Sequence, residues 1–496
     1  MKKTVLLLTM VAALLCGCSS KETVAPVDDD EVVDDFSGGG NGSNQNGNDQ
    51  GNNQGTDPGT DPGTDPGTDP GTDPGTDPGN TDPEPSTPQH PAETDKLGRK
   101  KIKIQFHVDS KSAEGIAYKK RVDAFNTQYS DTYIVSATFK ARTEGGADYE
   151  QQLIAQKMEG SLPDIITFDA PNCASYAKSE LLYNLNGALT AEEKADFLSL
   201  NQYAGGLFGL PIQESSAGFF YNKTLFAQAG IDVSGYTVEN PWTFAQFKDA
   251  CAKLKAKGVV PVDMRFDATK DETATYLLYP FIYAAGGDFV GSNGYNATGH
   301  YNTDATKKGF QFLKDLVTAE YTNYAIGATD FFTGKVGMYL SSGWTIPDLD
   351  NKFPQQFPNR DSWGLLPYPQ DVTRASATGS WSYGITLNGI DEKEPAIALL
   401  KWMTSAESTT VVTNATGMIP CRKSCVTNYA EGSPESVLLK QLEQTGKERP
   451  VTVGYPQFSA TFRDIIAKLK TKDVDSIVEA ATTELQAALD EIRANG

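Results

Sequence analysis

The chain has 496 residues and a formal net charge of −21, from 64 acidic and 43 basic residues. Residues 1–97 hold 18 Asp and Glu against 4 Lys, a net of −14, which leaves −7 for residues 98–496. The longer part therefore has an ordinary, mildly acidic surface, and no basic stripe indicates a nucleic-acid partner.

The first residues read MKKTVLLLTMVAALLCGCSS: two lysines, an apolar run over 5–15, and then Leu15-Cys16-Gly17-Cys18. The run is too short to span a bilayer, which predicts an exported leader over residues 1–17. The Leu-x-Gly-Cys order resembles a bacterial lipobox. This resemblance implies a lipoprotein whose new N-terminal residue, Cys18, carries the lipid, palmitate included, and holds the protein on the extracytoplasmic face of a membrane.

Residues 18–97 have a different composition from the rest. They include GGGNGSNQNGNDQGNNQG and six consecutive GTDP units over residues 55–78. Such a segment has too little apolar surface to offset its ordering entropy, so we expect a disordered tether. A glycine period of four excludes a collagen triple helix. The predicted role of the tether is to hold a folded domain, residues 98–496, away from the membrane.

Beyond the leader and the lipid site the sequence has four cysteines, Cys173, Cys251, Cys421 and Cys425, which do not form a disulfide framework. Cys421 and Cys425 would lie about 6 Å apart on a helix, within disulfide range, so their state is left open. A zinc site is not predicted, since no histidine cluster accompanies the pair.

From residue 101 the pattern alternates. Strands are predicted at 102–106, 133–139 and 162–170, and helices at 117–129 and 148–160. Further along, Val336, Met338 and Leu340 alternate with smaller residues, which predicts a half-buried strand ahead of Ser341-Ser342-Gly343-Trp344. This alternation favours βαβ units with a parallel sheet, and nearly 400 residues favour two lobes.

Six blocks, in order, carry a resemblance to a known family: GSLPDIITFDAPNCASYAKSELLYNL, LPIQESSAGFFYNKTLFAQAGID, PWTFAQFKDACAKLKAKG, FFTGKVGMYLSSGW, GSWSYGI and PAIALLKWMTSAESTTVVTNATGMIPCRKS. Together they resemble extracellular solute-binding proteins of the maltose-binding class. The resemblance implies an α/β, two-lobed periplasmic-binding-protein-like fold of type II.

The family topology implies hinge crossings near 211–214, 383–386 and 418–422. Lobe 1 would then comprise about 98–212 and 385–421, and lobe 2 about 213–384 and 422–496. The tail, ending in IVEAATTELQAALDEI, would form an amphipathic helix packed on the second lobe.

Candidate ligand residues follow from the resemblance and from the crevice that α/β sheets form at the carboxyl ends of their strands. Trp344 stands where the family places a stacking tryptophan. Trp381 and Tyr383, at the second crossover, are equally consistent with ligand stacking and with hinge packing. Trp242 is expected to be a structural residue at a helix entry.

The polar candidates are acceptors and donors suited to sugar hydroxyls. Asp169 either binds ligand or caps the helix near Pro171, and the family's acid at the first crossover falls on Glu214 or Ser215. Arg265 either reaches the cleft or forms a surface ion pair, and Arg422 either donates to ligand or braces the hinge. The remaining candidates are His107, Asp109 and Asn172.

The sequence therefore predicts a monomeric, lipid-anchored binding protein that captures a carbohydrate and delivers it to the permease of an ABC importer. Asp169 and Glu214 are two acids in a predicted sugar-binding cleft, which is the residue pair that a glycosidase uses. However, no enzyme motif is present, and no cofactor or metal is expected. A peptide or polyamine ligand, and a surface protein for glycan adherence, are the alternatives.

Overall fold

The computed structural model describes residues 90–142 and 147–495. The predicted leader, the lipid site at Cys18 and nearly all of the predicted tether lie outside these residues. Among the described residues, His90 already contacts Asp391 of the folded body, eight residues before the expected boundary at 98. The Ala92 amide donates a hydrogen bond to the Glu392 carboxylate, and the Ala92 side chain is buried. Thr94 pairs with Lys100 through an isolated β-bridge.

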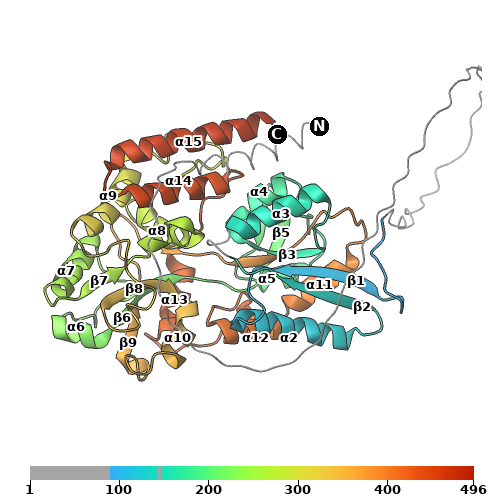
Figure 1. The fold of residues 1–496 in the computed structure, drawn as a ribbon, viewed down its shortest axis with the longest axis horizontal. Coiled ribbons are helices and arrows are strands. Elements are labelled where there is room, and N and C mark those ends of the chain that lie inside the picture. Colours follow the sequence, from blue (N-terminus) through green and yellow to red (C-terminus); the bar gives the residue numbers. More distant parts are fainter. Residues whose placement is uncertain (1–89, 143–146, 496) are drawn as a thin grey trace, which may run out of the picture. The chain divides into compact units, whose positions relative to one another are not determined.

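The first lobe is built on a mixed six-stranded sheet with the strand order β2-β1-β3-β11-β5-β4 (Figure 1). β1, β2 and β3 are parallel, whereas β11 is antiparallel to β3 and to β5. The strands are β1 (Lys100–Phe106), β2 (Tyr133–Phe139), β3 (Ile165–Asp169), β4 (Asn201–Tyr203), β5 (Gly206–Pro211) and β11 (Trp381–Ile385). The parallel βαβ units predicted from the sequence are thus present.

Helices cover both faces of this sheet. α2 packs against β2, α11 and α12 on one face, and the apolar cluster there includes Ile104 and Phe106. The cluster on the other face joins Ile166 and Phe168 of β3 to side chains of α3 and α4. The helices are α2 (Ala113–Gln128), α3 (Ala147–Glu159), α4 (Cys173–Lys178), α5 (Ala191–Ala195), α11 (Glu394–Met403) and α12 (Ala406–Thr416).

The second lobe has a four-stranded sheet with the order β7-β8-β6-β9. β8 runs parallel to β7 and antiparallel to β6, so it lies inside the sheet and every one of its residues is buried. The predicted strand is therefore present, but it is buried on both faces rather than one. The strands are β6 (Ala217–Asn222), β7 (Val260–Asp263), β8 (Val336–Ser342) and β9 (Trp363–Leu366), with the short pair β10 (Ser376–Ala377) and β12 (Gly446–Lys447) beside them.

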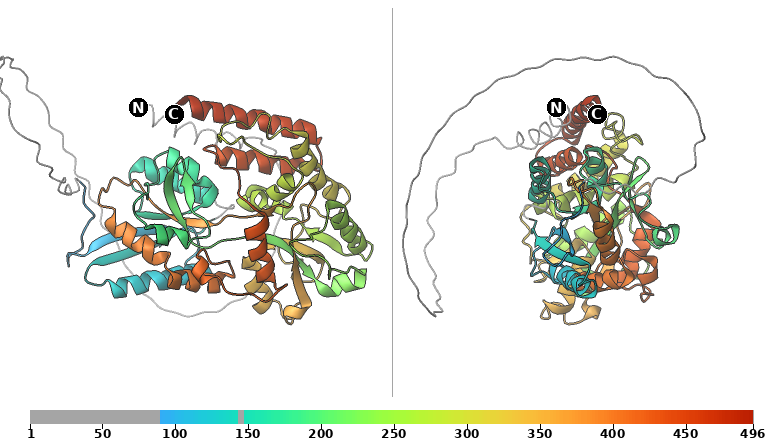
Figure 2. Two further views of the ribbon diagram at one scale, coloured as in Figure 1. Left: turned by 180° about the vertical axis from the view of Figure 1, so that it is seen from behind. Right: turned by 90° about the vertical axis from the view of Figure 1, so that its right-hand side faces the viewer.

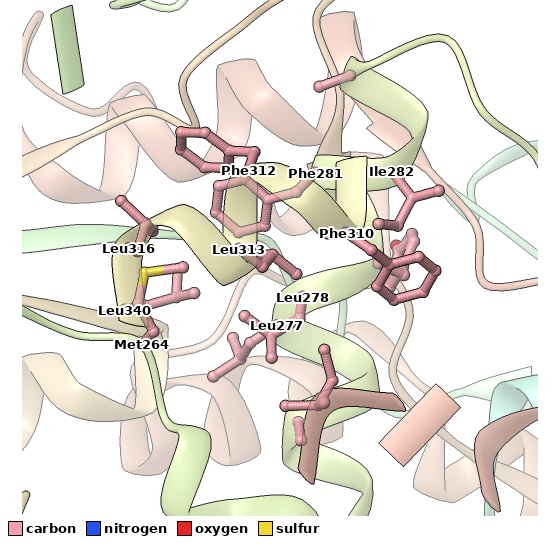
Figure 3. Close-up of a cluster of buried hydrophobic side chains, with 14 of the residues drawn as sticks. Met264, Leu277, Leu278, Phe281, Ile282, Phe310, Phe312, Leu313, Leu316 and Leu340 are labelled. Atoms are coloured by element: carbon pink, nitrogen blue, oxygen red, sulfur yellow. The ribbon is translucent and has the colours of Figure 1, made fainter. Parts of the chain in front are cut away.

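The main core of the second lobe joins its sheet to α8 and α9, as Figure 3 shows for residues such as Phe281, Leu313 and Leu340. The predicted amphipathic tail is α15, which packs with α14 against α8 and α9 along one side (Figure 2). The helices of this lobe are α6 (Lys223–Ala229), α7 (Phe244–Lys255), α8 (Glu272–Ala284), α9 (Asp304–Thr318), α10 (Ile346–Asn351), α13 (Pro434–Thr445), α14 (Tyr455–Lys468) and α15 (Val474–Asn495).

Three connections join the two sheets. The first runs from β5 to β6 over residues 212–216. The second lies between β10 and β11, at residues 378–380, a few residues earlier than expected, because Trp381–Ile385 already pairs with β3 and β5 of lobe 1. The third ends later than expected, since Arg422–Ser424 still contacts Phe197 and Asp196 of lobe 1 before the chain reaches α13.

No helix within residues 90–142 and 147–495 combines the length and the apolar character needed to cross a membrane. Trp242, expected to be a structural residue at a helix entry, is buried in the second lobe, and so is Trp363. Trp402 is half-buried against the lobe 1 core and donates its indole N–H to the Arg121 carbonyl.

Candidate functional site

A cavity of about 640 Å³ lies between the two lobes. Its walls are formed mainly where strands end: His107 follows β1, Arg142 follows β2 and Asp169 closes β3, while Arg265 follows β7 and Trp344 follows β8. This is the edge at which open α/β sheets bind ligands. Its size is within the range of small-molecule sites.

Trp344 is the exposed aromatic side chain of this cavity. β8 ends at Ser342, a single 3-10 turn (Gly343–Thr345) follows, and the turn leads directly into α10. Gly343 is required there because a Cβ atom would meet the Gly417 carbonyl oxygen at 2.4 Å. The tight approach places Trp344 on the cavity wall with 40% of its surface exposed, and Tyr276 of α8 lies 5.9 Å from it, centroid to centroid.

Trp381 also lines the cavity, but its ring is already in contact with two protein side chains. The His107 imidazole stacks on the indole at 3.5 Å with an interplanar angle of 3°, and the Arg142 guanidinium lies 4.6 Å from the ring centroid. His107 is buried and shares a hydrogen bond with the Thr167 hydroxyl. Burial, and secondarily the Arg142 charge, lower its pKa well below the usual value, so it stacks as a neutral ring. Of the two roles left open for Trp381, packing fits the structure.

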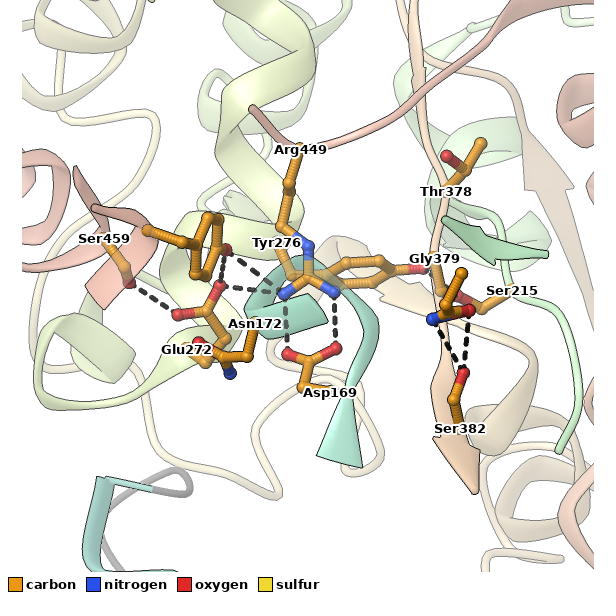
Figure 4. Close-up of polar contacts among 12 residues, drawn as sticks. Asp169, Asn172, Ser215, Glu272, Tyr276, Thr378, Gly379, Ser382, Arg449 and Ser459 are labelled. Carbon is orange, nitrogen blue, oxygen red and sulfur yellow. Dashed lines mark hydrogen bonds and ion pairs between the residues drawn. The ribbon is translucent and has the colours of Figure 1, made fainter. Parts of the chain in front are cut away.

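Asp169 accepts a two-pronged ion pair from a residue that sequence reasoning missed. Arg449, in the segment between β12 and α14, donates to the two carboxylate oxygens of Asp169 at 2.7 and 2.8 Å (Figure 4). Asp169 is an N-terminal cap by position, but its side chain makes no capping hydrogen bond. Its carboxylate is therefore committed to an arginine of the opposite lobe, and the capping alternative is wrong.

Arg449 is almost fully buried and has a second anionic partner. Glu272, at the start of α8, accepts a hydrogen bond of 2.8 Å from Arg449. Its carboxylate also accepts hydrogen bonds from the hydroxyls of Tyr455 and Ser459 of α14 (Figure 4). Burial alone would lower the pKa of Arg449, but the neighbouring Asp169, Tyr455 and Glu272 raise it well above the ordinary value. The arginine is thus a fixed charge that joins β3 of lobe 1 to α8 and α14 of lobe 2.

Three further sequence candidates line the same cavity. Ser215 contacts the Tyr276 hydroxyl at 2.7 Å and donates to the Gly379 carbonyl. Asp109 is exposed and accepts the Lys111 amide. Arg265 fits both roles considered for it, because it lines the cavity and also contacts Asp267 and the Tyr339 hydroxyl.

Four candidates lie elsewhere. Glu214 is buried on the wall of a different cavity, where it accepts a hydrogen bond from Ser199. Asn172 is buried and donates to Glu150, and Tyr383 is packed in the lobe 1 core. Arg422 pairs with Asp196 and lies over the Phe197 ring, a brace within lobe 1. A position near a strand end could not predict which of these residues would line the cavity, because adjacent residues of an extended segment point to opposite sides.

Besides Arg449, sequence reasoning missed cavity residues from both lobes. They include Glu114, Arg142, Gln213, Glu272, Tyr276, Asp348 and Thr416. Glu272 and Tyr276 are four residues apart on α8 and therefore share a face, a spacing visible in DETATYLLY. Arg449 has no such signal, since it stands in a loop without a motif.

Within the described residues, no group of His, Cys, Asp and Glu side chains is arranged to hold a metal ion. Cys421 and Cys425, whose pairing the sequence left open, are both free thiols. The cavity therefore offers one exposed aromatic face, carboxyl groups at Asp109, Glu114 and Asp348, and a guanidinium at Arg265, all suited to binding a polar organic solute.

Comparison with known proteins agrees with this geometry. A model of the bacterial extracellular solute-binding protein family matches residues 120–437. Curated relatives described as binding proteins in Brucella abortus (strain 2308) and Brucella suis biovar 1 (strain 1330) are 26% identical over 286 residues. That match spans 55% of this chain and 66% of each relative.

Solved structures share the fold. The cyclic alpha-maltosyl-1,6-maltose binding protein from Arthrobacter globiformis aligns with a TM-score of 0.66 at 24% identity, over 79% of this chain and 100% of that one. Maltose-bound T. maritima MalE3 aligns with a TM-score of 0.64 at 19% identity, over 78% of this chain and 99% of that one. UgpB from Mycobacterium tuberculosis, in complex with glycerophosphocholine, aligns with a TM-score of 0.64 at 19% identity, over 79% of this chain and 99% of that one.

The matched region covers well over half of the sequence and includes strands of both sheets. The chain belongs to the bacterial extracellular solute-binding protein family and has its two-lobed α/β fold.

Proposed function

We propose that this solute-binding protein captures a mono- or oligosaccharide in the cavity between its lobes and delivers it to the permease of an ABC importer. The observation that carries the proposal is Trp344: an indole with 40% of its surface exposed faces a cavity of about 640 Å³ whose walls also present carboxyl and guanidinium groups.

The chemistry of these groups suits sugar rings. A flat aromatic surface complements the apolar face of a pyranose, and planar carboxylate, amide and guanidinium groups each serve several hydroxyls. Asp109 and Glu114 from lobe 1, and Asp348 and Arg265 from lobe 2, line the cavity on opposite sides. A sugar between them would contact both lobes at once.

The relatives support a carbohydrate, since the Arthrobacter globiformis and T. maritima proteins are named for binding maltose-type sugars. The Mycobacterium tuberculosis protein, with glycerophosphocholine, has the same fold, so the fold alone does not select the ligand class. Trp344 and the polar groups around it are therefore the features that favour a sugar.

Capture would proceed by hinge closure. Lobe 1 comprises residues 90–211 and 381–425, and lobe 2 comprises residues 217–377 and 434–495, with the three connections between them as the hinge. Ligand contacts from both lobes would shift an open–closed equilibrium, and the closed, loaded form would dock on the permease as a monomer.

Turnover is not part of the proposal. A glycosidase needs two carboxyl groups facing one glycosidic bond. Asp169 is held by Arg449, and Glu214 lines a different cavity, so these two acids do not flank one site. A peptide or polyamine ligand is less favoured, since the cavity wall presents an exposed tryptophan rather than polar groups alone.

The membership in an extracellular family supports a place in the cell envelope. We further propose that Cys18 is lipid-modified and that residues 19–89 tether the body to the membrane. Full-length protein should fractionate with membranes, and Cys18→Ala should release it. Membrane association that survives Cys18→Ala would refute the anchor while leaving the ligand proposal untouched.

The test of function is isothermal titration of residues 19–496 with mono- and oligosaccharides, amino acids, peptides and polyamines. One sugar series should bind, and Trp344→Ala should weaken it at least tenfold, or about 1.4 kcal/mol. Trp402→Phe, a half-buried tryptophan outside the cavity, is the matched control and should bind normally. Binding of peptides alone would keep the fold and overturn the sugar, and equal affinity in Trp344→Ala would remove its proposed role.

A further inference from the structure

A second cavity, of about 420 Å³, lies next to the first. Gly379, Ser380 and Arg449 line both cavities, so the hinge segment 378–380 and the buried arginine form the partition between them. The other walls come from both lobes: Ala170, Pro171, Cys173, Ala174, residues 198–202 and Pro211 of lobe 1, and Leu442, Glu443, Gly446, Glu448 and Val451 of lobe 2. The second cavity is thus also an interlobe space, on the other side of the hinge.

Carboxyl groups dominate the charge of this second cavity. Glu214, Glu443 and Glu448 line it, and Arg449 is the one basic residue on its wall. Both terminal nitrogens of Arg449 are held by Asp169 and Glu272, which leaves its charge more than balanced. No cationic side chain on the wall is therefore available to the three glutamates.

Glu214 is the unusual member of this set because it is 98% buried (2% exposed), whereas Glu443 and Glu448 are exposed. Its partner is the Ser199 hydroxyl on one carboxyl oxygen. Burying a carboxylate without a cation is costly. Burial raises the pKa of Glu214 to about 7, the Ser199 hydrogen bond opposes the shift, and the charge of Glu448 adds to it.

A second polar residue on this wall also has an unused hydrogen-bonding group. Ser380 is 8% exposed, and its hydroxyl has no hydrogen-bond partner among the described residues. By contrast, the neighbouring Asn201 and Ser382 satisfy each other through a reciprocal pair of 3.0 Å contacts (Figure 4). The cavity thus combines a buried carboxyl group that lacks a cation with a buried hydroxyl that lacks a partner.

We propose that this second cavity binds a small organic ammonium ion, such as an aliphatic diamine, with Glu214 as its buried counter-ion and Glu448 as a second carboxylate nearer the solvent. An ammonium group donates several hydrogen bonds, which suits Glu214 Oε2 and Ser380 Oγ together. A bare metal ion fits less well, because the described residues contain no cluster of metal-ligating side chains. The site is separate from the proposed sugar site and does not depend on it.

The test uses residues 19–496 and two probes of equal length, 1,4-diaminobutane and the uncharged 1,4-butanediol, titrated up to 10 mM at pH 8. We expect saturable binding of the diamine and none of the diol. Glu214→Gln, which keeps the shape and the contact to Ser199, should weaken diamine binding at least tenfold, and Glu448→Gln should weaken it to a lesser extent. Asp348→Asn, a carboxylate of the first cavity, is the matched control and should bind the diamine normally.

Sugar binding is measured on the same samples, so that the two proposals fail separately. Trp344→Ala should lose the sugar and keep the diamine, while Glu214→Gln should keep the sugar and lose the diamine. Diamine binding that is lost in Trp344→Ala but kept in Glu214→Gln would place the amine in the first cavity and overturn the second site. Absence of diamine binding by the unaltered chain would also overturn it, with Glu214 then simply a buried neutral acid.

Discussion

Arg449 of lobe 2 holds Asp169 of lobe 1 through two hydrogen bonds of 2.7 and 2.8 Å, in a site where both side chains are more than nine-tenths buried. The pair joins the end of β3 to the segment that leads into α14, and it lies on the partition between two cavities. A fixed ion pair at this point links the separation of the lobes to the charge state of the site.

Breaking this pair should destabilise the protein strongly. Arg449→Ala leaves the buried Asp169 and the partly buried Glu272 without a cation, which should lower the free energy of unfolding by about 3–5 kcal/mol. The combined Asp169→Asn and Arg449→Ala variant should recover part of the loss, because neither charge of the pair remains. Urea unfolding of the single and double variants measures this coupling, and strictly additive losses would contradict it.

Trp381 should act on stability rather than on ligand stacking, since His107 stacks on its ring and Arg142 lies over it. Trp381→Ala should lower the free energy of unfolding by about 3 kcal/mol, the lower end for tryptophan because the ring is only half-buried. Trp381→Phe should keep sugar affinity within about threefold, well below the tenfold change that defines an anchor. A tenfold loss in Trp381→Phe, measured by titration, would instead make it a ligand contact.

Glu214 should give stability a dependence on pH. Its pKa is raised to about 7 in the folded protein, against about 4.3 in an unfolded chain. Between these values the folded state holds the extra proton, so the free energy of unfolding falls as pH rises, by about 4 kcal/mol in total.

Glu214→Gln should remove this term, so the variant should be only slightly more stable than the unaltered chain near pH 5, and its advantage should be largest near pH 8. The exposed Glu443→Gln serves as the control and should follow the unaltered chain at both values. Urea unfolding at the two pH values decides the matter; a Glu214→Gln variant that is less stable at pH 8 would show that the ionised form is well stabilised.

The cysteines should react according to burial. Burial raises the pKa of Cys173 and of Cys421 to about 12, and Cys251 is shifted in the same direction. Cys425 is only partly buried, and all four thiols are free. In residues 19–496, a thiol reagent should therefore modify one cysteine in the folded protein and four after unfolding. Three rapidly reacting thiols, or none, would contradict this arrangement.

The sequence by itself determined the local elements and the family resemblance. Alternation of apolar residues specified β1, β2 and β8, because side chains of a strand point to its two faces in turn, and a short apolar run after Pro163 specified β3. The break after Ser341-Ser342-Gly343 placed Trp344 at a strand end, and strand ends form the crevice in this class of fold.

Only the tertiary structure decided which polar groups share a cavity. Glu214 and Ser215 are adjacent in the sequence but line different cavities, because neighbouring residues of an extended hinge segment point in opposite directions. Arg449 reaches Asp169 across 280 positions of the chain, through crossings that no local pattern encodes. Periodicity records which side of an element is buried, whereas partners that come from distant segments are set by the path of the chain between the lobes.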